Sequence, residues 1–276
     1  TRTRKAEAAN YPFCTIYPNV GVVQVPDSRL VPLAELVGTT SIIHAAMEMV
    51  DIAGLVRGAS QGEGLGNKFL ANVREVDAIV HVVRCFEDDE VIHKMGRVDP
   101  IADAEIIITE LILADVESVL GQLQKNEKKA RGQDKNAAAN VALLERLLPH
   151  LNKGSSANLL DLDEEDEIRM KSFCLLSSKP MLYACNLKED EIAEPDSNSN
   201  FKSFRKWANQ QQHTQCCSIS AKMEEELSEL EDPDAKEYLE AMGVEDSGVS
   251  SLIRATYKLL GLASYLTAGE KETRAW

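Results

Sequence analysis

Residues 47–66 read MEMVDIAGLVRGASQGEGLG, and the organisation of the chain can be worked out from this stretch. It begins as a short apolar segment that ends at Asp51, and Asp51–Gly54 fits the pattern DxxG. An Asp at a strand end can hold Mg²⁺ through water, and a Gly lets its backbone N–H approach a terminal phosphate. Four further glycines follow within twelve residues and give a segment that adopts positive φ easily. The stretch predicts a phosphate-binding loop after a strand, with a plain Gly-rich turn as the alternative.

Polar residues end three of the five segments that are typical of short buried strands. These three residues are Asp51, Asn186 and Ser220. Helical patterns separate the later strands, which predicts an α/β fold with a mostly parallel sheet. Ligands of such sheets bind at the carboxyl ends of the strands, so we expect the chemistry there. The five predicted strands are Val20–Val25, Met47–Asp51, Ala78–Cys85, Met181–Asn186 and Gln215–Ser220.

About ninety-five residues without a strand pattern separate the third and fourth predicted strands. Apolar residues recur at helical spacing over Asp103–Lys129 and again over Asn136–Leu151. A polar stretch with Gly132 lies between them, so we expect an antiparallel helical hairpin that projects from the sheet domain. The acidic run Asp161–Glu167 is typical of a helix start. Further helices are expected over 201–212, over 224–242 with an interruption near Pro233, and over 249–260.

Composition excludes several classes of protein. The 276 residues are 44% hydrophobic and 27% charged, which is ordinary globular composition, and the net charge of −15 argues against a general DNA or phosphate-backbone binder. Six cysteines lack CxxC spacing, and Cys85, Cys185, Cys216 and Cys217 are expected to be buried free thiols of a cytoplasmic protein. No apolar run reaches the roughly 18 residues of a membrane span, and we expect neither a membrane span nor a signal peptide.

Three more segments fit a nucleotide site. Thr15 precedes the first predicted strand, where its hydroxyl could ligate Mg²⁺. Asn186–Glu189 (NLKE) occupies the place of the NKxD loop that reads the base in GTPases, with Leu187 in place of Lys and Glu189 in place of Asp. The longer carboxylate should weaken the recognition of guanine. Ser220–Lys222 (SAK) follows the last strand, in the place of the loop that closes over the base.

These loops occur in the order found in one family. The chain resembles the Obg-like ATPases, namely the YchF subfamily of translation-factor-class P-loop NTPases, and the likeness extends from end to end. Residues 50–93 are the most specific part. The matching stretches are NYPFCTIYPNVGVVQVPDSRL, VDIAGLVRGASQGEGLGNKFLANVREVDAIVHVVRCFEDDEVIH, NLKED, SISAK and RATYKLLGLASYLTAGEKETRAW.

The resemblance implies a G domain with a coiled-coil insertion, Mg²⁺ as cofactor, hydrolysis of ATP in preference to GTP, and association with ribosomes. It divides the chain into G-domain residues 1–102, the helical insertion 103–175, G-domain residues 176–265, and the start of a TGS domain at 266–276. Site residues follow by position. Thr15 and Asp51 would hold Mg²⁺, Gly54 would face the γ-phosphate, Asn186, Leu187 (by its backbone) and Glu189 would bind adenine, and Ser220 and Ala221 would close the base pocket.

The catalytic water is the least defined part of the expected site. Leu55 follows the DxxG pattern, where many GTPases carry a Gln that orients the attacking water. A neutral imidazole could accept a hydrogen bond from that water, and His93 is the residue we name for this role. A solvent-exposed loop histidine without a role is the alternative for His93.

The sequence departs from the family pattern in one respect, because it contains no GxxxxGK[ST]. The family carries this P-loop upstream of what is Thr1 here, so we expect a partial sequence of an ATPase. The alternatives are a catalytically inactive, nucleotide-free interaction module or, less favoured, a GTPase. A ribosome contact by an acidic chain needs a local basic patch. The turn of the predicted hairpin supplies one, with a solvated helix end as the alternative: Lys125, Lys128, Lys129 and Arg131.

Overall fold

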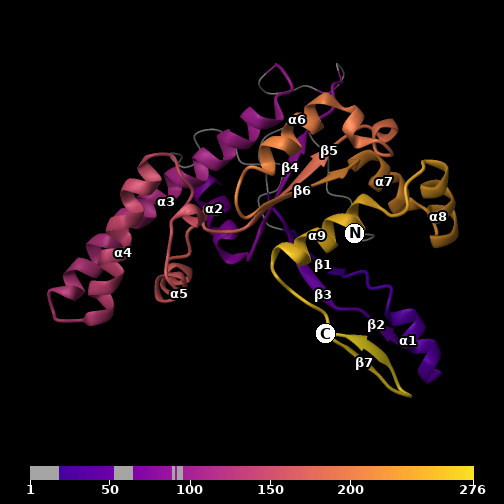
Figure 1. Cartoon of the computed structure of the whole chain (residues 1–276), viewed down its shortest axis with the longest axis horizontal. Coiled ribbons are helices and arrows are strands. Elements are labelled where there is room, and N and C mark those ends of the chain that lie inside the picture. Colours follow the sequence, from indigo (N-terminus) through magenta and orange to yellow (C-terminus); the bar gives the residue numbers. More distant parts are fainter. Residues whose placement is uncertain (1–18, 53–64, 89–90, 92–95) are drawn as a thin grey trace.

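The structure is a computed structural model that describes residues 19–52, 65–88, 91 and 96–276. Thr15, Gly54 and His93, which the sequence proposes for the site, lie outside the described residues. A three-stranded parallel sheet in the order β4–β5–β6 forms the centre of the molecule (Figure 1). Its strands are β4 (Ile79–Arg84), β5 (Met181–Asn186) and β6 (Thr214–Ile219), each within one or two residues of its predicted bounds.

The middle strand β5 is buried along almost its whole length, because helices cover both faces of the sheet. On one face the Tyr183 ring lies 5.1 Å from the ring of Phe204 and 5.8 Å from that of Trp207. On the other face Leu182 packs against Leu252. The covering helices are α2 (Leu65–Glu75), the first part of α3 (Pro100–Ala130) and α6 (Ser199–Ala208) on the first face, and α9 (Gly248–Leu259) on the second.

A separate antiparallel ribbon holds the first and third strands, β1 (Asn19–Gln24) and β3 (Ala46–Asp51). Val23 and Val25 turn inward from this ribbon and pack against Ile253 of α9. Within the described part of the chain, β3 pairs with β1 and β4 pairs with β5, but β3 and β4 are not hydrogen-bonded to each other. The predicted parallel sheet is therefore confirmed for β4, β5 and β6, while the first two predicted strands pair with each other.

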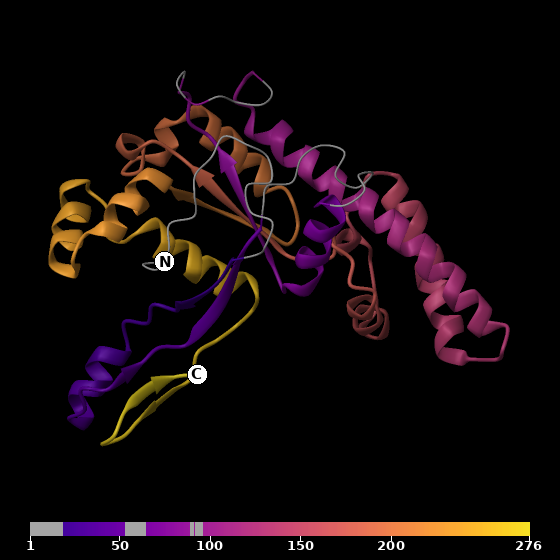
Figure 2. The ribbon, with the colours of Figure 1, turned by 180° about the vertical axis from the view of Figure 1, so that it is seen from behind.

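The expected helical hairpin is present and extends away from the sheet (Figure 2). Helix α3 begins at Pro100 behind its cap Asp99, whose carboxylate accepts a hydrogen bond from Ala102 N at 3.1 Å. Asp134 caps the returning helix α4 (Lys135–Asn152) in the same way. The two helices share one apolar core with α5, so hydrophobic burial holds the hairpin together. Helix α5 (Glu164–Ser172) starts within the predicted acidic run.

The remaining elements are short. A small sheet in the order β2–β8–β7 was not predicted, because each of its strands has only two or three residues and β2 pairs with β8 about 230 positions away. The helix expected over 224–242 is divided, as predicted, near Pro233. These elements are α1 (Leu30–Val37), β2 (Ile42–Ile43), α7 (Ala221–Glu229), α8 (Asp232–Ala241), β7 (Leu266–Ala268) and β8 (Thr273–Ala275).

The cysteines agree in part with expectation. Cys85 and Cys185 are buried and free, whereas Cys216 and Cys217 are free but only partly buried, because β6 is an edge strand of its sheet. Among the described helices, none combines the length and the apolar character that crossing a lipid bilayer requires.

Candidate functional site

Two of the three polar strand ends lie side by side at the carboxyl edge of the parallel sheet. The register aligns Arg84 with Asn186 and Asn186 with Ile219, so the residues that follow these strands emerge next to one another. Ser220 therefore lies beside Asn186. Asp51 ends β3 in the separate ribbon, in which it pairs with Asn19.

Hydrogen bonds join the NLKE and SAK loops directly. The side-chain oxygen Oδ1 of Asn186 accepts a hydrogen bond from the backbone N–H of Ala221 at 2.9 Å. The backbone N–H of Leu187 donates to the carbonyl of Ile219 at 2.8 Å, and that of Cys85 donates to the carbonyl of Asn186 at 2.9 Å. Two loops 35 positions apart in sequence thus form one unit, as the sequence predicts.

Burial decides which parts of the two loops can meet a ligand. The side chain of Leu187 is only 2% exposed and packs in the core beneath the sheet edge, so it leaves only its backbone near the surface. Ser220 is equally buried, and its hydroxyl caps α7 by accepting from Met223 N at 3.5 Å. Both residues shape the loops, and neither side chain projects from them.

Glu189 and Lys222 are the charged pair of this site. Lys222 Nζ lies 2.9 Å from Oε2 of Glu189, and this hydrogen bond raises the pKa of the Lys222 ammonium. The other carboxylate oxygen, Oε1, is withdrawn from solvent and has no hydrogen-bond partner among the described residues. Glu189 was predicted from the sequence, but its pairing with Lys222 was not, because nothing in the spacing fixes how these two side chains meet.

A second acidic residue, Glu191, fixes the shape of the NLKE loop. Its Oε2 accepts from the backbone N–H of Lys188 at 3.0 Å, and its Oε1 accepts from Asn198 Nδ2 at 2.8 Å. The amides of Asn198 and Asn200 also approach the carbonyl of Cys85, at 3.3 and 3.2 Å. The loop is thereby fastened to the start of α6 and to the end of β4. Sequence reasoning missed Glu191, whose only signal is its place in the acidic segment after NLKE.

Arg84 organises the loop after β4. Its guanidinium donates to three backbone carbonyls, those of Phe86 at 3.0 Å, Val91 at 2.9 Å and Asp88 at 3.0 Å. One side chain therefore folds this segment, which leads toward the position of His93. The only signal of this role in the sequence is an arginine at the end of an otherwise apolar strand, and Arg84 was not predicted as a functional residue.

Asp51 is the only described member of the expected Mg²⁺ set. Its carboxylate makes no ion pair within the described part of the chain, and it is the type of oxygen ligand that Mg²⁺ prefers. Among the described residues, no group of three or more His, Cys, Asp or Glu side chains is placed to hold a metal ion. Asp51 thus fits one ligand of such an ion, while Thr15 lies outside the described residues.

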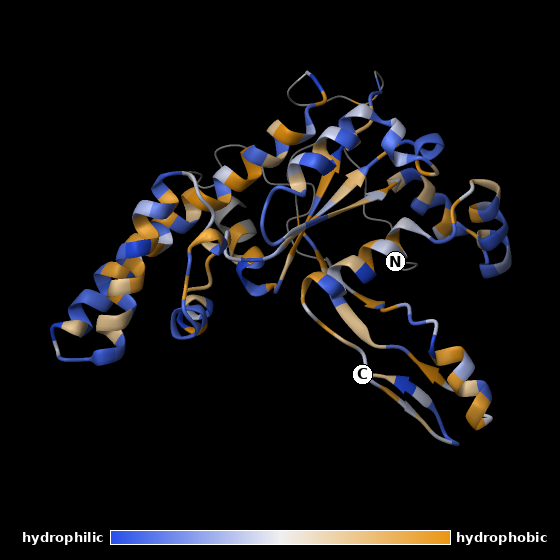
Figure 3. Ribbon diagram, in the orientation of Figure 1, coloured by the Kyte–Doolittle hydropathy of each residue, from blue (hydrophilic) through white to orange (hydrophobic). Residues whose placement is uncertain are grey.

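The tip of the hairpin carries the basic patch expected from the sequence. Its lysines and arginine are exposed, and they form no ion pairs within the described residues. Figure 3 shows the tip as a strongly hydrophilic end of the molecule, remote from the sheet. The patch consists of Lys125, Lys128, Lys129 and Arg131.

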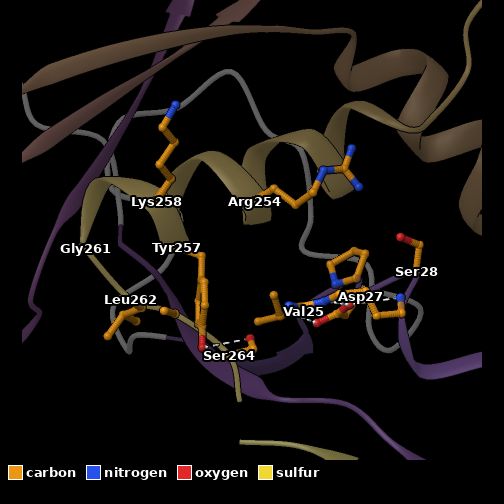
Figure 4. Close-up of a pocket in the computed structure, with 12 residues that line it drawn as sticks. Val25, Asp27, Ser28, Arg254, Tyr257, Lys258, Gly261, Leu262 and Ser264 are labelled. Atoms are coloured by element: carbon orange, nitrogen blue, oxygen red, sulfur yellow. Dashed lines mark hydrogen bonds and ion pairs between the residues drawn. The ribbon is translucent and has the colours of Figure 1, made fainter. Parts of the chain in front are cut away.

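A hollow of about 480 Å³ lies away from these strand ends, between the start of α1 and the end of α9 (Figure 4). Its two arginines are already paired, Arg29 with Asp27 at 2.7 Å and Arg254 with Asp246 at 2.6 Å. Tyr257 reaches across the hollow and meets Ser264, with 3.3 Å between their hydroxyl oxygens. Because both arginines already have acidic partners and the hollow lies away from the ends of the parallel strands, those strand ends remain the favoured site.

Comparison with known proteins identifies several similar chains. A family model described as 50S ribosome-binding GTPase matches residues 1–112. The chain is 48% identical to a ribosome-binding ATPase YchF of Bacillus subtilis, over 98% of this chain and 74% of that protein. It is 46% identical to the protein of the same name from Escherichia coli O157:H7, over 98% of this chain and 73% of that protein.

A solved structure extends the similarity to the fold. The Schizosaccharomyces pombe YchF GTPase superimposes with a TM-score of 0.80 at 34% identity. The match covers 100% of this chain and 74% of that one. An α/β G-domain fold with a helical insertion is therefore shared over the whole length of the chain.

Proposed function

Because the chain belongs to the YchF family of ribosome-binding ATPases, we propose that it uses Mg²⁺ to bind and hydrolyse ATP and that it prefers ATP to GTP. The observation that supports this best is the hydrogen bond from Ala221 N to Asn186 Oδ1, which joins the NLKE and SAK loops. A base pocket needs both loops at one edge, and ligands of parallel sheets bind at this edge.

The base is held by the two joined loops in this proposal. Asn186 positions the SAK loop, and the backbone of Leu187 approaches the adenine while its side chain anchors the loop in the core. Glu189 accepts from the base with its carboxylate, which also contacts Lys222. Ser220 and Ala221 close the pocket at the start of α7.

The phosphates and the metal lie nearer to the ribbon in this proposal. Thr15 and Asp51 hold Mg²⁺, which when bound neutralises the charge that develops on the phosphates. Gly54 offers its backbone N–H to the γ-phosphate. His93 accepts a hydrogen bond from the attacking water, because Leu55 has no polar group that could orient it.

We further propose that the hairpin carries the ribosome contact of this cytoplasmic protein. In this proposal residues 1–102 and 176–265 make up the G domain, and residues 103–175 make up the insertion. The basic tip patch supplies local positive charge on a chain whose net charge is −15, and RNA phosphates attract such a patch.

Calorimetric titration of the protein purified from its source tests the nucleotide proposal. In the presence of Mg²⁺, ATP should bind more tightly than GTP, and chelation of the metal should weaken both. Asn186→Ala should weaken both nucleotides about tenfold or more, because it releases Ala221 from the NLKE loop. Asn209→Ala, at the exposed end of α6, is the matched control.

The same titration separates the alternatives. A ligand at 100 times its Kd stabilises a protein by about 2.7 kcal/mol. If millimolar MgATP and MgGTP produce neither heat nor a shift in unfolding, the protein is an interaction module. Tighter binding of GTP than of ATP would favour a GTPase.

Ribosome co-sedimentation tests the contact at the tip. Reversing the four charges of the tip patch to Glu should move most of the protein from the ribosomal pellet into the supernatant. Four exposed lysines elsewhere serve as a matched control, which should still sediment. Unchanged sedimentation of the tip variant would exclude the tip as the contact. The control lysines are Lys171, Lys202, Lys206 and Lys236.

A further inference from the structure

Arg84 is the last residue of β4, so it lies at the carboxyl edge of the parallel sheet, where it is aligned with Asn186. Each nitrogen of its guanidinium donates to a different backbone carbonyl. Nε donates to Phe86 at 3.0 Å, Nη1 to Val91 at 2.9 Å and Nη2 to Asp88 at 3.0 Å. The Cζ atom also lies 4.6 Å from the centre of the Phe86 ring, which is a cation–π contact. All three nitrogens of this side chain therefore hold the loop that follows its own strand.

The same loop is fixed at its start by the candidate nucleotide site. The backbone N–H of Cys85 donates to the carbonyl of Asn186 at 2.9 Å. The carbonyl of Cys85 accepts from the side-chain amide of Asn198 at 3.3 Å. Bonds from the site and from Arg84 thus recur along the chain from Cys85 to Val91.

The last carbonyl that Arg84 holds belongs to Val91, two residues before His93. His93 lies outside the described residues, but the length of chain that leads to it limits where it can be. Two residues span at most about 7 Å, so a fixed Val91 confines residue 93 to a small volume. From Cys85 the eight residues to His93 span up to about 27 Å when extended. Arg84 therefore removes most of the positional freedom of this segment.

We propose that Arg84 is a positioning residue for ATP hydrolysis, because it holds in one conformation the loop that leads to His93. This inference rests on the proposed function, in which His93 accepts a hydrogen bond from the water that attacks the γ-phosphate. Such a group must stay within hydrogen-bond reach of the water, and a misplacement of about 1 Å can lower a rate about a hundredfold. Arg84 itself contacts neither water nor nucleotide in this proposal, so it affects turnover and leaves nucleotide affinity unchanged.

Other roles for Arg84 predict different results. If Arg84 contributed only to stability, its loss would lower the free energy of unfolding, and the kcat of the folded protein would stay as in wild type. If Arg84 shaped the nucleotide site as a whole, its loss would raise KM together with the fall in kcat. Positioning of the group that orients the water lowers kcat alone, because that group acts in the transition state.

Steady-state ATP hydrolysis by the protein expressed from its complete gene provides the test. Arg84→Met keeps an unbranched apolar side chain against Phe86 but removes all three hydrogen bonds. Its kcat should fall about fivefold or more, while KM stays within about twofold of wild type. Arg84→Lys replaces the planar fork by a single ammonium group, so it should recover only part of this loss.

Arg205→Met is the matched control. Arg205 also lies over an aromatic ring, with its Cζ atom 5.6 Å from the centre of the Phe201 ring, and it pairs with Asp196 at 2.8 Å. Both bonds hold parts of α6 and the turn before it, away from the loop after β4. The kcat of Arg205→Met should therefore equal that of wild type.

A double-mutant cycle with His93→Ala tests whether Arg84 acts through His93. His93→Ala alone should lower kcat at least as much as Arg84→Met does. Adding Arg84→Met to His93→Ala should lower kcat no further, because no imidazole remains to be positioned. If the two losses multiply, the residues act independently and the inference is wrong.

The outcomes keep this inference apart from the proposed function. If wild type hydrolyses ATP and Arg84→Met lowers kcat less than about fivefold, or raises KM by the same factor, Arg84 is not a positioning residue and the proposed function stands. If wild type does not hydrolyse ATP, the proposed function fails and this inference fails with it. Unfolding curves give the folded fraction of each variant, and kcat is calculated per folded molecule, so a loss of stability is not mistaken for a loss of turnover.

Discussion

The two ends of strand β5 are occupied by carboxylates in opposite situations. Before the strand, Asp115 of α3 accepts three hydrogen bonds, from Leu176 N, Ser177 N and Ser177 Oγ, each at 2.7 Å. After the strand, Glu189 accepts one from Lys222, and its other oxygen is shielded from solvent and has no partner in the described part of the chain. Asp115 is fully buried, whereas the side chain of Glu189 is 25% exposed.

The difference distinguishes a carboxylate that holds the fold together from one that belongs to the candidate nucleotide site. Both oxygens of Asp115 are engaged by this turn, and Lys179 of the same turn donates to the carbonyls of Arg74 and Val76 at the end of α2. Burial raises the pKa of Asp115, and the hydrogen bonds of Leu176 and Ser177 oppose this rise. This end of β5 thus joins α2 and α3 to the sheet.

Replacing the two carboxylates one at a time tests whether the two ends of β5 contribute differently to stability. Asp115→Ala should lower the free energy of unfolding by about 3 kcal/mol or more, since it leaves two buried N–H groups unpaired. Glu189→Ala should cost less than about 1 kcal/mol, because it loses only one ion pair to an exposed lysine. Urea unfolding measures both. Equal losses would mean that the end of β5 near Glu189 is as structural as the start.

The fold was largely predictable where the signal is local. All five expected strands and the hairpin appear in the structure, because apolar periodicity within a segment is the primary local signal of secondary structure. The role of Asp115 was not predictable, since in the helical run it is one polar residue among several, and its partners lie 61 and 62 positions away. The small sheet of β2, β8 and β7 was not predicted for the same reason, because it depends on long-range pairing of very short strands.

The candidate site, too, was predictable from the sequence only in part. The positions of Asn186 and Ser220 could be predicted, because a polar residue at the end of an apolar strand is a local pattern. The side-chain partners could not, because spacing does not fix which oxygen of Glu189 Lys222 takes, or that Glu191 binds the NLKE backbone. The roles of Thr15, Gly54 and His93 stay predictions, since they lie outside the described residues.

The stability of the protein should depend on pH through His81, which lies on β4 opposite Tyr183 of β5. Burial lowers the pKa of His81 from 6.5 to about 4, and within residues 19–52, 65–88, 91 and 96–276 its Nδ1 has no hydrogen-bond partner. Between these two values the unfolded chain binds a proton that the folded chain does not, so stability falls as the pH drops from 6.5 toward 4. The loss should reach at most about 3 kcal/mol.

Matched variants isolate this effect in unfolding curves recorded at several pH values. His81→Phe keeps a ring against Tyr183, which lies 5.7 Å away between centroids, and should flatten the dependence over this range. His213→Asn removes an exposed histidine at a positive φ that Asn tolerates, and should leave the dependence as in wild type. If His81→Phe has the same pH dependence of stability as wild type, His81 takes up its proton in the folded protein as readily as in the unfolded chain.

The smallest expected effect concerns how firmly the NLKE loop holds Glu189 in place. Glu191→Gln retains an oxygen for Asn198 but places an amide group where Lys188 N now donates to Oε2. Losing that one bond costs about 1 kcal/mol, so the Lys188 amide should exchange its hydrogen roughly fivefold to tenfold faster. The Leu187 amide, bonded instead to Ile219, should keep its rate. If both amides exchange faster together, the loop opens as one unit with the strand end. If only the Lys188 amide exchanges faster, Glu191 holds the loop in place locally, and the loop can open without the strand end.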